Sequence, residues 1–300
     1  PYDWPHVRDF LAARAVPGVE RVDARGYART VASESGHALV CVRPLEDEDA
    51  LELRVRGAAP GALFQLSSAA RRMFDLAADP ARIAASFKGD PLLGPLVKAC
   101  PGLRIPGAWD PFECAVRAVL GQQVSVVAGR TFAARLVARA GTPIEDGDDG
   151  LTHLFPSPAA LAAANLDDLG LTGARVAALR ALARAVNEAS LDLRAPVEET
   201  VAALAALPGF GDWTAQYVAL RALGEPDAFP SADLVLRRVA GAAGAPLSAR
   251  ALAARAEAWR PWRGYATVHL WRASRTVSDG LRRSKTVQEE RPHRRMAITG

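Results

Sequence analysis

Residues 101–271 carry apolar residues at intervals of three and four, in segments rich in Ala, Leu and Arg that Pro and Gly interrupt. This spacing places the apolar side chains on one face of a helix and predicts a succession of helices. We expect them over residues 110–140 with one break, 157–164, 166–169, 173–189, 197–206, 212–222, 232–239 and 249–271 with a break at Pro261. Because no unit repeats at a fixed period, the pattern favours an irregular bundle over a solenoid.

The first hundred residues follow a different pattern. Apolar and polar residues alternate in short runs between Val19 and Val55, as at residues 38–42 and 51–55, which predicts an antiparallel sheet. Helical spacing returns on either side, at residues 3–15 and 62–76. The predicted fold is therefore mainly α with an N-terminal α+β domain. Its three parts are an α+β domain (residues 1–100), a helical core (101–274) and a basic, disordered tail (275–300).

Composition excludes several classes of protein. Three cysteines, Cys41, Cys100 and Cys114, are too scattered for a disulfide framework or a local thiolate metal cluster, so we expect no cofactor and no metal held by side chains. No apolar run reaches the ~18 residues of a membrane span, and the first residues lack the profile of a signal peptide, which predicts a cytoplasmic, nucleoid-associated protein. The pI of about 9.3 is compatible with binding a polyanion. Because the sequence starts with Pro, we expect processing or excision from a longer chain.

The run LPGFGDWTA at residues 207–215 lies between two helical patterns, at about residues 204–222. Gly209 and Gly211 permit positive φ and carry no side chain, so the backbone can approach a phosphate while amide groups of the next helix point outward. Two helices joined in this way hold DNA through its backbone without reading sequence. The structural alternative is an ordinary helix–glycine–helix turn.

Asp233 opens another helical pattern about twenty residues further on, within FPSADLVLRR at residues 229–238. Asp is a favoured helix cap, and its carboxylate would then only satisfy free backbone N–H groups. The functional alternative is a catalytic carboxylate. Residue type and position alone do not separate the two.

The glycine hairpin followed by Asp233 resembles the pattern of the helix-hairpin-helix DNA glycosylases. Three further segments resemble the 3-methyladenine DNA glycosylase II family: residues 2–4 (YDW), 110–125 (DPFECAVRAVLGQQVS) and 259–263 (WRPWR). The resemblance runs from Pro1 to Trp271. It implies a repair enzyme that flips alkylated bases out of double-stranded DNA and hydrolyses the N-glycosidic bond, leaving an abasic site.

The resemblance also implies roles for individual residues. Asp233 is the catalytic carboxylate, which stabilises the positive charge that develops on the sugar. The residues expected at the base pocket are Trp213, Tyr217, Trp271, Phe10 and Leu234. The residues expected to contact DNA are Gln122, Gln123, Ser125, Gly209, Phe210, Gly211 and Thr214. Among these, Gln123 stands where some relatives carry a Leu that fills the hole left by the flipped nucleotide. The family further implies a monovalent cation at the backbone carbonyls of Ala205, Leu207 and Phe210.

Related glycosylases that also nick the strand have a lysine at the position of Trp213, which forms a Schiff base with the sugar. This sequence has no lysine between Lys98 and Lys285, so we expect a monofunctional enzyme without lyase activity, acting as a monomer. Three alternatives remain open. They are an oxidative-damage glycosylase with lyase activity, a noncatalytic helix-hairpin-helix DNA-binding part of an alkylation-response regulator, and a helical scaffold protein.

Overall fold

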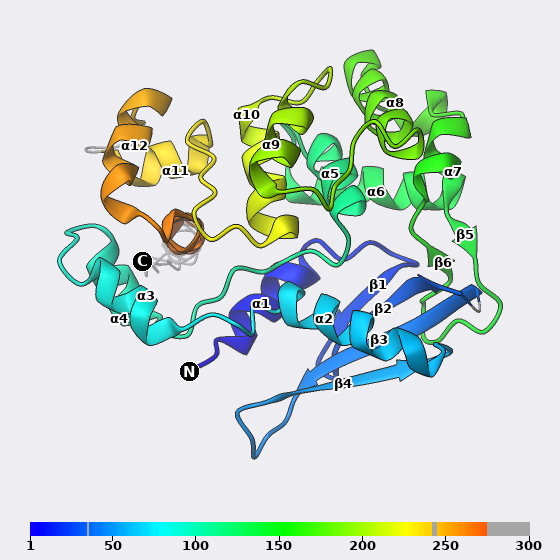
Figure 1. Ribbon diagram of the computed structural model, residues 1–300, viewed down its shortest axis with the longest axis horizontal. Coiled ribbons are helices and arrows are strands. Elements are labelled where there is room, and N and C mark those ends of the chain that lie inside the picture. Colours follow the sequence, from blue (N-terminus) through cyan, green and yellow to red (C-terminus); the bar gives the residue numbers. More distant parts are fainter. Residues whose placement is uncertain (35, 242–244, 275–300) are drawn as a thin grey trace, which may run out of the picture.

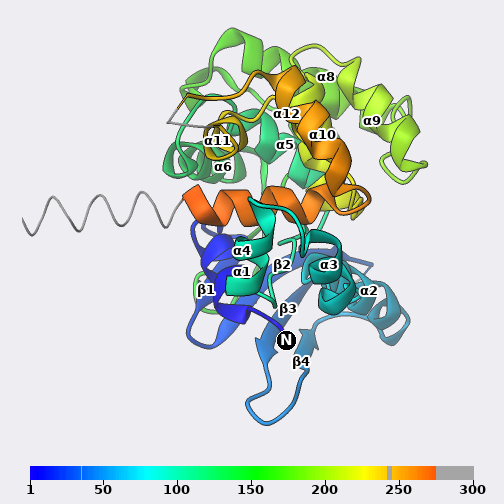
Figure 2. The ribbon, with the colours of Figure 1, turned by 90° about the vertical axis from the view of Figure 1, so that its left-hand side faces the viewer.

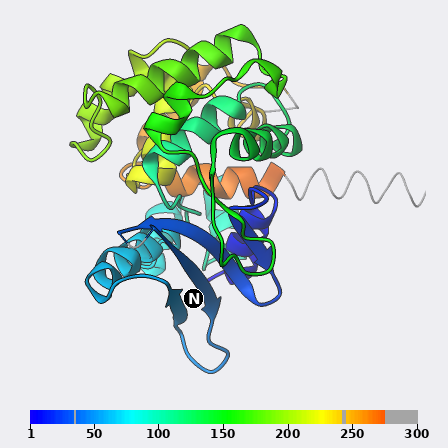
Figure 3. The same cartoon turned by 90° about the vertical axis from the view of Figure 1, so that its right-hand side faces the viewer.

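The computed structural model describes residues 1–34, 36–241 and 245–274. A sheet with its helices forms one layer of the molecule and a helical bundle forms the other, as Figure 1 shows. A helix over residues 263–274 lies between the two layers in both side views (Figures 2 and 3). The predicted fold class is confirmed. The tail expected over residues 275–300 lies outside the described residues.

The sheet is an antiparallel meander with the strand order β1-β2-β3-β4. Its strands are β1 (Glu20–Asp23), β2 (Gly26–Ser33), β3 (Gly36–Pro44) and β4 (Leu51–Arg56). Residues Tyr27 and Val31 of β2 pair with Val42 and Ala38 of β3, so that the alternating apolar side chains meet on one face. Two helices cover that face, α1 (Trp4–Ala12) and α2 (Leu63–Met73). The alternating apolar residues of these strands therefore pack against α1 and α2.

The helical layer is built around α5, all but two of whose residues are buried. Its first elements are α5 (Pro111–Leu120), α6 (Val126–Ala140), α7 (Pro158–Ala163), η2 (Asp167–Leu169) and α8 (Gly173–Asn187). They continue with α9 (Val197–Ala205), α10 (Asp212–Val218), η3 (Ala219–Leu223), α11 (Leu234–Val239), α12 (Ala249–Ala256) and η4 (Glu257–Trp259). The break expected between residues 110 and 140 is the turn at residues 121–125.

Capping side chains set where many of these helices begin. Asp110 opens α5 by accepting a hydrogen bond from the backbone N of Glu113 (2.8 Å), and Pro111 follows at the first helical position. Ser125 opens α6 in the same way through the backbone N of Ala128 (3.1 Å). Such short polar residues ahead of an apolar pattern are the signal from which the helix starts could be predicted.

Four short elements were not expected from the sequence: the helices α3 (Pro80–Phe87) and α4 (Leu93–Ala99), and the paired strands β5 (Thr142–Pro143) and β6 (His153–Leu154). The two helices share their core with the C-terminal helices, and the indole N–H of Trp259 donates to Asp90 beside α4 (2.7 Å). Their apolar residues are thus matched by partners more than a hundred residues away, which local periodicity does not reveal.

The segment that contains β5 and β6 extends from the helical layer to the sheet, as Figure 3 shows. Leu151 packs against Ala28 and Leu39 on the sheet face that α1 and α2 leave uncovered. The Thr30 hydroxyl donates to the carbonyl of His153 (2.6 Å). The sheet is therefore packed on both faces, and the two layers are held together at this edge. Among the helices of the described ranges, none combines the length and the apolar character that a membrane span requires.

Candidate active site

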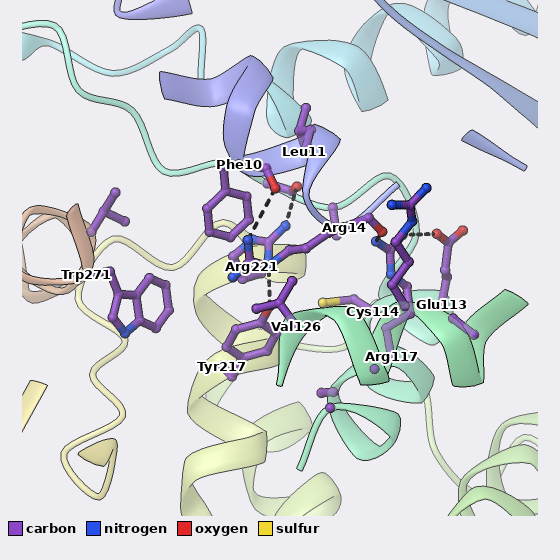
Figure 4. A pocket seen from close by; sticks show the side chains of 18 of the residues that line it. Phe10, Leu11, Arg14, Glu113, Cys114, Arg117, Val126, Tyr217, Arg221 and Trp271 are labelled. Atoms are coloured by element: carbon purple, nitrogen blue, oxygen red, sulfur yellow. Dashed lines mark hydrogen bonds and ion pairs between the residues drawn. The ribbon is translucent and has the colours of Figure 1, made fainter. Parts of the chain in front are cut away.

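A pocket of about 400 Å³ opens between α1, α5, α6, α10, α11 and the helix over residues 263–274. Side chains from both layers line it, and Figure 4 shows the part around Phe10, Tyr217, Arg221 and Trp271. Four of the five residues expected at the base pocket line it together with the expected catalytic carboxylate: Trp213, Tyr217, Trp271, Phe10 and Asp233. These residues come from sequence positions more than two hundred residues apart, and the fold brings them to one cavity.

The aromatic wall of the pocket follows from helical spacing on α10. Trp213 and Tyr217 are four residues apart, so their side chains lie on the same face, and their rings stack with centroids 5.3 Å apart and an interplanar angle of 20°. The ring of Trp271 lies 6.1 Å from that of Tyr217, at 50°. Three electron-rich rings therefore border one cavity.

Asp233 is the N-cap of α11 and lies at the pocket wall, half-buried. Its Oδ1 accepts hydrogen bonds from the backbone N of Val235 (2.8 Å) and of Leu236 (3.1 Å). Its Oδ2 accepts one from Nε1 of Trp213 (3.0 Å). The two readings of Asp233 from the sequence are therefore compatible, because one oxygen caps the helix while the other is oriented by a residue of the aromatic wall.

Leu234 does not line the pocket, contrary to expectation, and 46% of its surface is exposed. The next residue, Val235, lines the pocket instead, together with Val126 at the start of α6. Asp233 caps the helix, so Leu234 and Val235 are its first two residues and point in different directions. Val127, beside Val126, is 72% exposed, so exposed apolar side chains occur at the starts of both α6 and α11.

Phe10 is only 3% exposed, and two arginines lie against its ring. The guanidinium carbon of Arg14 is 3.7 Å from the ring centroid, and that of Arg221 is 4.6 Å away. Phe10 thus already engages protein cations. Sequence reasoning missed both arginines, although Arg221 stands four residues after Tyr217 and eight after Trp213 on the same helical run, a spacing that indicates a shared face.

The inner wall of the pocket is a buried network of charges. The Arg29 guanidinium donates to Glu113 (2.7 Å), and Arg117 donates to both Glu113 and Glu20 (2.8 Å each). Burial alone would raise the pKa of Glu20, but Arg117 and Arg29 outweigh it and hold that pKa below its usual value. Arg117 also donates to the carbonyl of Arg14 (2.7 Å), which fixes the chain after α1 against the pocket.

Cys114 also lines the pocket, but its thiol is unreactive. Burial raises the pKa of the Cys114 thiol to about 11, so the thiol stays protonated at neutral pH. In the part of the chain that the structure describes, no three His, Cys, Asp or Glu side chains form a group suited to a metal ion. Two other carboxylates line the pocket, those of Glu20 and Glu113, and both are paired with arginines, whereas Asp233 is hydrogen-bonded to the aromatic wall.

The turn before α6 contacts the glycine hairpin through one side chain. Nε2 of Gln122 donates to the carbonyl of Gly209 (2.9 Å) and to the hydroxyl of Thr214 (3.1 Å). Gln123 is exposed at the tip of the turn, with φ at +54°. Ser125 is exposed and caps α6. The two segments expected to contact DNA are therefore held side by side, Gln122 as the link and Gln123 as the protruding residue.

The two hairpin glycines have different conformations. Gly209 has φ at +78°, whereas Gly211 has φ at −105°, which any residue adopts. The side chains of Phe210 and Thr214 are buried, so contacts of these two residues with DNA would be made by their backbone. The carbonyl of Leu207 accepts a hydrogen bond from the N of Phe210 (3.0 Å), and a carbonyl oxygen has a second lone pair with which to bind a cation.

This combination of a hairpin and a carboxylate at an aromatic pocket defines a class of DNA repair protein. The model of the HhH-GPD superfamily base excision DNA repair proteins matches residues 116–263, and that of the AlkA N-terminal domain matches residues 1–110. More specifically, the chain belongs to the family of DNA-3-methyladenine glycosylase 2. It is 36% identical to the Escherichia coli (strain K12) protein of that name over 277 residues, which cover 90% of this chain and 94% of that one.

The similarity extends to a longer protein. The chain is 42% identical over 273 residues to a probable bifunctional transcriptional activator/DNA repair enzyme AlkA of Mycobacterium tuberculosis, which is 90% of this chain but 55% of that protein. The chain thus spans about half the length of the first curated relatives it matches. Among solved structures, the 3-methyladenine DNA-glycosylase from Archaeoglobus fulgidus has a TM-score of 0.78 at 23% identity, covering 92% of this chain and 96% of that one. The family resemblance predicted from the sequence is confirmed.

Proposed function

We propose that the protein is a DNA repair glycosylase that removes alkylated bases from double-stranded DNA and leaves an abasic site. The observation that carries the proposal is the position of Asp233, whose carboxylate borders a cavity walled by Trp213, Tyr217 and Trp271. The relatives named as 3-methyladenine glycosylases support the choice of substrate class.

Asp233 would act on the sugar of a nucleotide extruded into the pocket. Breaking the bond between C1′ and the base develops positive charge on the deoxyribose, and an anion fixed beside it lowers the energy of that state. The hydrogen bond from Trp213 keeps Oδ2 in place, so no reorganisation is needed as the charge develops. A water molecule then adds to C1′, with its proton accepted by the carboxylate or by the departing base.

DNA would be held on the face where the hairpin and the turn before α6 meet. The backbone at Gly209 and Gly211 would bind phosphates, assisted by a monovalent cation at the carbonyls of Ala205, Leu207 and Phe210. Gln123 would enter the space that the extruded nucleotide leaves, with Ser125 beside it. Because hairpin, turn and pocket all belong to one chain, we propose that a monomer is sufficient, working on the DNA of the nucleoid.

The reaction would stop at the abasic site. Cleavage of the strand through a Schiff base needs an amine, and at the corresponding position Trp213 offers an indole N–H that already donates to Asp233. No lysine occurs between residues 98 and 285. We expect the abasic strand to remain intact until it is treated with alkali.

The decisive experiment follows base release from methylated duplex DNA by the wild type and by Asp233→Asn. Asn caps helices as well as Asp does, so α11 is retained and only the charge is lost. We expect release to fall by at least about a hundredfold, as for the loss of a single group that stabilises charge in the transition state, with DNA binding unchanged. Asp79→Asn is the matched control, because Asp79 also caps a helix through two backbone N–H groups, remote from the pocket.

The M. tuberculosis relatives carry a transcriptional activator in their name, which makes a noncatalytic DNA-binding role the main alternative. That alternative predicts salt-dependent DNA binding without base release, and identical behaviour of wild type and Asp233→Asn. Either of these results would contradict the proposed activity.

A further inference from the structure

The turn at residues 121–125, between α5 and α6, holds one residue in an unusual conformation. Gln123 has φ at +54°, in the left-handed region that residues with a side chain adopt only at a cost in free energy. It is exposed, and its side chain forms no hydrogen bond with any residue that the structure describes. Such a conformation persists only where its surroundings hold it. The contacts on either side of Gln123 must therefore keep the turn in place.

The contacts before Gln123 converge on Gln122. The side chain of Gln122 donates to the carbonyl of Gly209 (2.9 Å) and to the hydroxyl of Thr214 (3.1 Å). Its own carbonyl accepts a hydrogen bond from the guanidinium of Arg175, in the first turn of α8. That carbonyl belongs to the peptide group that joins Gln122 to Gln123. Arg175 therefore fixes one of the two peptide planes that define the backbone conformation of Gln123.

Arg175 stands where helix formation alone gives no reason for a cation. It is the third residue of α8, and a positive charge in the first turn of a helix opposes the helix dipole. Arg175 is half-buried, and its guanidinium carbon lies 5.8 Å from the ring centroid of Phe132 in α6. Among residues 1–34, 36–241 and 245–274 it forms no ion pair with a carboxylate. Its charge is used instead in the hydrogen bond to Gln122, and such a charge-assisted bond is stronger than one from a neutral donor.

We infer that Arg175 is a positioning residue for base extrusion: it holds the peptide between Gln122 and Gln123 so that Gln123 is presented from the tip of the turn to the duplex. The inference rests on the proposed function, in which Gln123 enters the space that the extruded nucleotide leaves. A side chain that is already held in the required direction loses less conformational freedom on entry. Arg175 thus favours extrusion, a step that precedes the cleavage at Asp233.

The same contacts join the turn to the glycine hairpin. Gln122 is bound to Arg175 through its carbonyl and to Gly209 through its side chain, so α8, the turn and the hairpin form one unit. On the far side of Gln123, Ser125 caps α6 through the backbone N of Ala128 (3.1 Å). The segment that binds phosphates and the residue that enters the duplex are therefore kept at a fixed distance from each other.

The test measures extrusion and cleavage separately. Its substrate is a duplex with one 7-methylguanine and a neighbouring 2-aminopurine, whose fluorescence rises when the stacking beside it is lost. Stopped-flow fluorescence reports extrusion, and single-turnover base release reports the reaction as a whole. For Arg175→Met we expect both to fall by about tenfold or more, as for the loss of one hydrogen bond from a charged group. Arg175→Lys keeps a charged donor and should recover most of the loss.

A second pair of variants tests the conformation of Gln123 itself. Asn adopts the left-handed region several-fold more readily than other residues with a side chain, and Gln123→Asn keeps the amide group. The turn should then depend less on Arg175. We expect Arg175→Met to reduce extrusion by no more than about threefold when it is introduced into Gln123→Asn, so that the two changes are not additive.

Arg180→Met is the matched control, because it removes the same charge from an exposed position of the same helix and should change neither extrusion nor release. All variants are compared at a temperature where denaturant titration shows them folded. The rival role for Arg175 is a direct contact with a DNA phosphate. That role predicts an equal loss of affinity for unmodified duplex and a salt dependence of binding that is reduced by about one phosphate.

Three results would overturn the inference while the proposed function stands. They are unchanged extrusion in Arg175→Met, the phosphate-contact result on unmodified duplex, and an equal loss from Arg175→Met with Gln or Asn at position 123. Failure of the wild type to release the methylated base would overturn the proposed function and the inference together.

Discussion

The two oxygens of Asp233 have different partners, which makes its structural role compatible with the proposed chemical one. Oδ1 is committed to the backbone of α11, and Oδ2 to the indole N–H of Trp213. Asp90 has the same arrangement, with Oδ1 bound to two backbone N–H groups at the start of α4 and Oδ2 bound to the indole N–H of Trp259, but it does not line the pocket. Position at the pocket wall, and not the hydrogen bonds alone, therefore distinguishes Asp233.

Replacing Trp213 by Phe isolates the hydrogen bond from Trp213 to Asp233. The variant keeps an aromatic ring against Tyr217 but has no N–H to donate to Asp233. Hydrogen bonds to charged groups contribute about 1.5–3 kcal/mol, so we expect base release to slow by roughly ten- to a hundredfold. Trp271→Phe is the control, because Trp271 lies in the same pocket without a described bond to Asp233. Equal losses in single-turnover release for the two variants would show that ring size, not the hydrogen bond, is what matters.

Asp75 allows a prediction about pH and stability. Its carboxylate is largely buried, and it accepts hydrogen bonds from the backbone N of Ile105 (3.1 Å) and from the Tyr265 hydroxyl (2.9 Å). Burial raises its pKa to about 6, from a usual value of 3.8. The folded protein therefore holds a proton between pH 4 and 6 that the unfolded chain has released, so Asp75 stabilises the fold at low pH and loses that contribution as the pH rises through 6.

Asp75→Asn should remove this dependence, since an amide does not ionise in this range. From pH 4 to 7, the free energy of unfolding of the wild type should fall by about 1–3 kcal/mol relative to that of Asp75→Asn. Chemical denaturation at several pH values measures it. A comparison of variants is needed because burial lowers the pKa of His269 to about 4, which gives the opposite slope over the same range. A constant difference across this range would contradict the prediction.

At the scale of elements, the two glycines of the hairpin differ in backbone conformation and in the space around them. A Cβ on Gly209 would lie 2.6 Å from the Cβ of Ala178 in α8, and its φ is positive. A Cβ on Gly211 would meet nothing within 4 Å, and its φ is negative. Gly209 is therefore needed for packing and conformation, whereas Gly211 leaves open space before α10.

The pair Gly209→Ala and Gly211→Ala tests this difference. We expect Gly209→Ala to destabilise the protein by about 1–3 kcal/mol, because the backbone must shift against α8, and to weaken DNA binding. Gly211→Ala should leave the free energy of unfolding within about 0.5 kcal/mol of the wild type, so that any loss of DNA affinity there reports on contact with phosphate alone. Denaturant titration and salt-dependent DNA binding measure the two effects. Equal stability losses would contradict the structural distinction.

The elements also show what the sequence could and could not predict. Most helices from α5 to α12 begin at a capping side chain, and the longer ones carry an apolar stripe, so local patterns predict them. Other residues have partners that are remote in sequence. Phe87 of α3 belongs to the same buried cluster as Trp259, and Arg221 of η3 lies against the ring of Phe10. Local periodicity carries no information on such partners. The residues Trp213, Tyr217 and Asp233 were predicted as a site through family resemblance, not through spacing.

At the scale of the whole molecule, buried charges connect the sheet to the helical layer. Arg29 belongs to β2, and Glu113 and Arg117 belong to α5; the side chains of Arg29 and Glu113 are only 4% and 5% exposed. Glu20 of β1 completes the network through Arg117 and the hydroxyl of Tyr27. The two positive and two negative groups balance, so burial is tolerable only while all four are present.

Glu113→Gln should therefore destabilise the protein far more than the loss of an exposed carboxylate. It leaves Arg29 buried without its counterion and removes one of two partners from Arg117, which predicts a loss of about 3–5 kcal/mol in the free energy of unfolding. Glu52→Gln is the matched control: Glu52 also pairs with two arginines, Arg43 and Arg54, but both are well exposed, so its loss should change the free energy of unfolding little. Adding Arg29→Met to Glu113→Gln removes both charges of one pair, so the double variant should lose less stability than the sum of the two single losses. Because Arg117 also positions Arg14 at the pocket, Glu113→Gln should slow base release even at temperatures where the variant is fully folded. Additive losses in denaturant titrations would show that the network does not act as a unit.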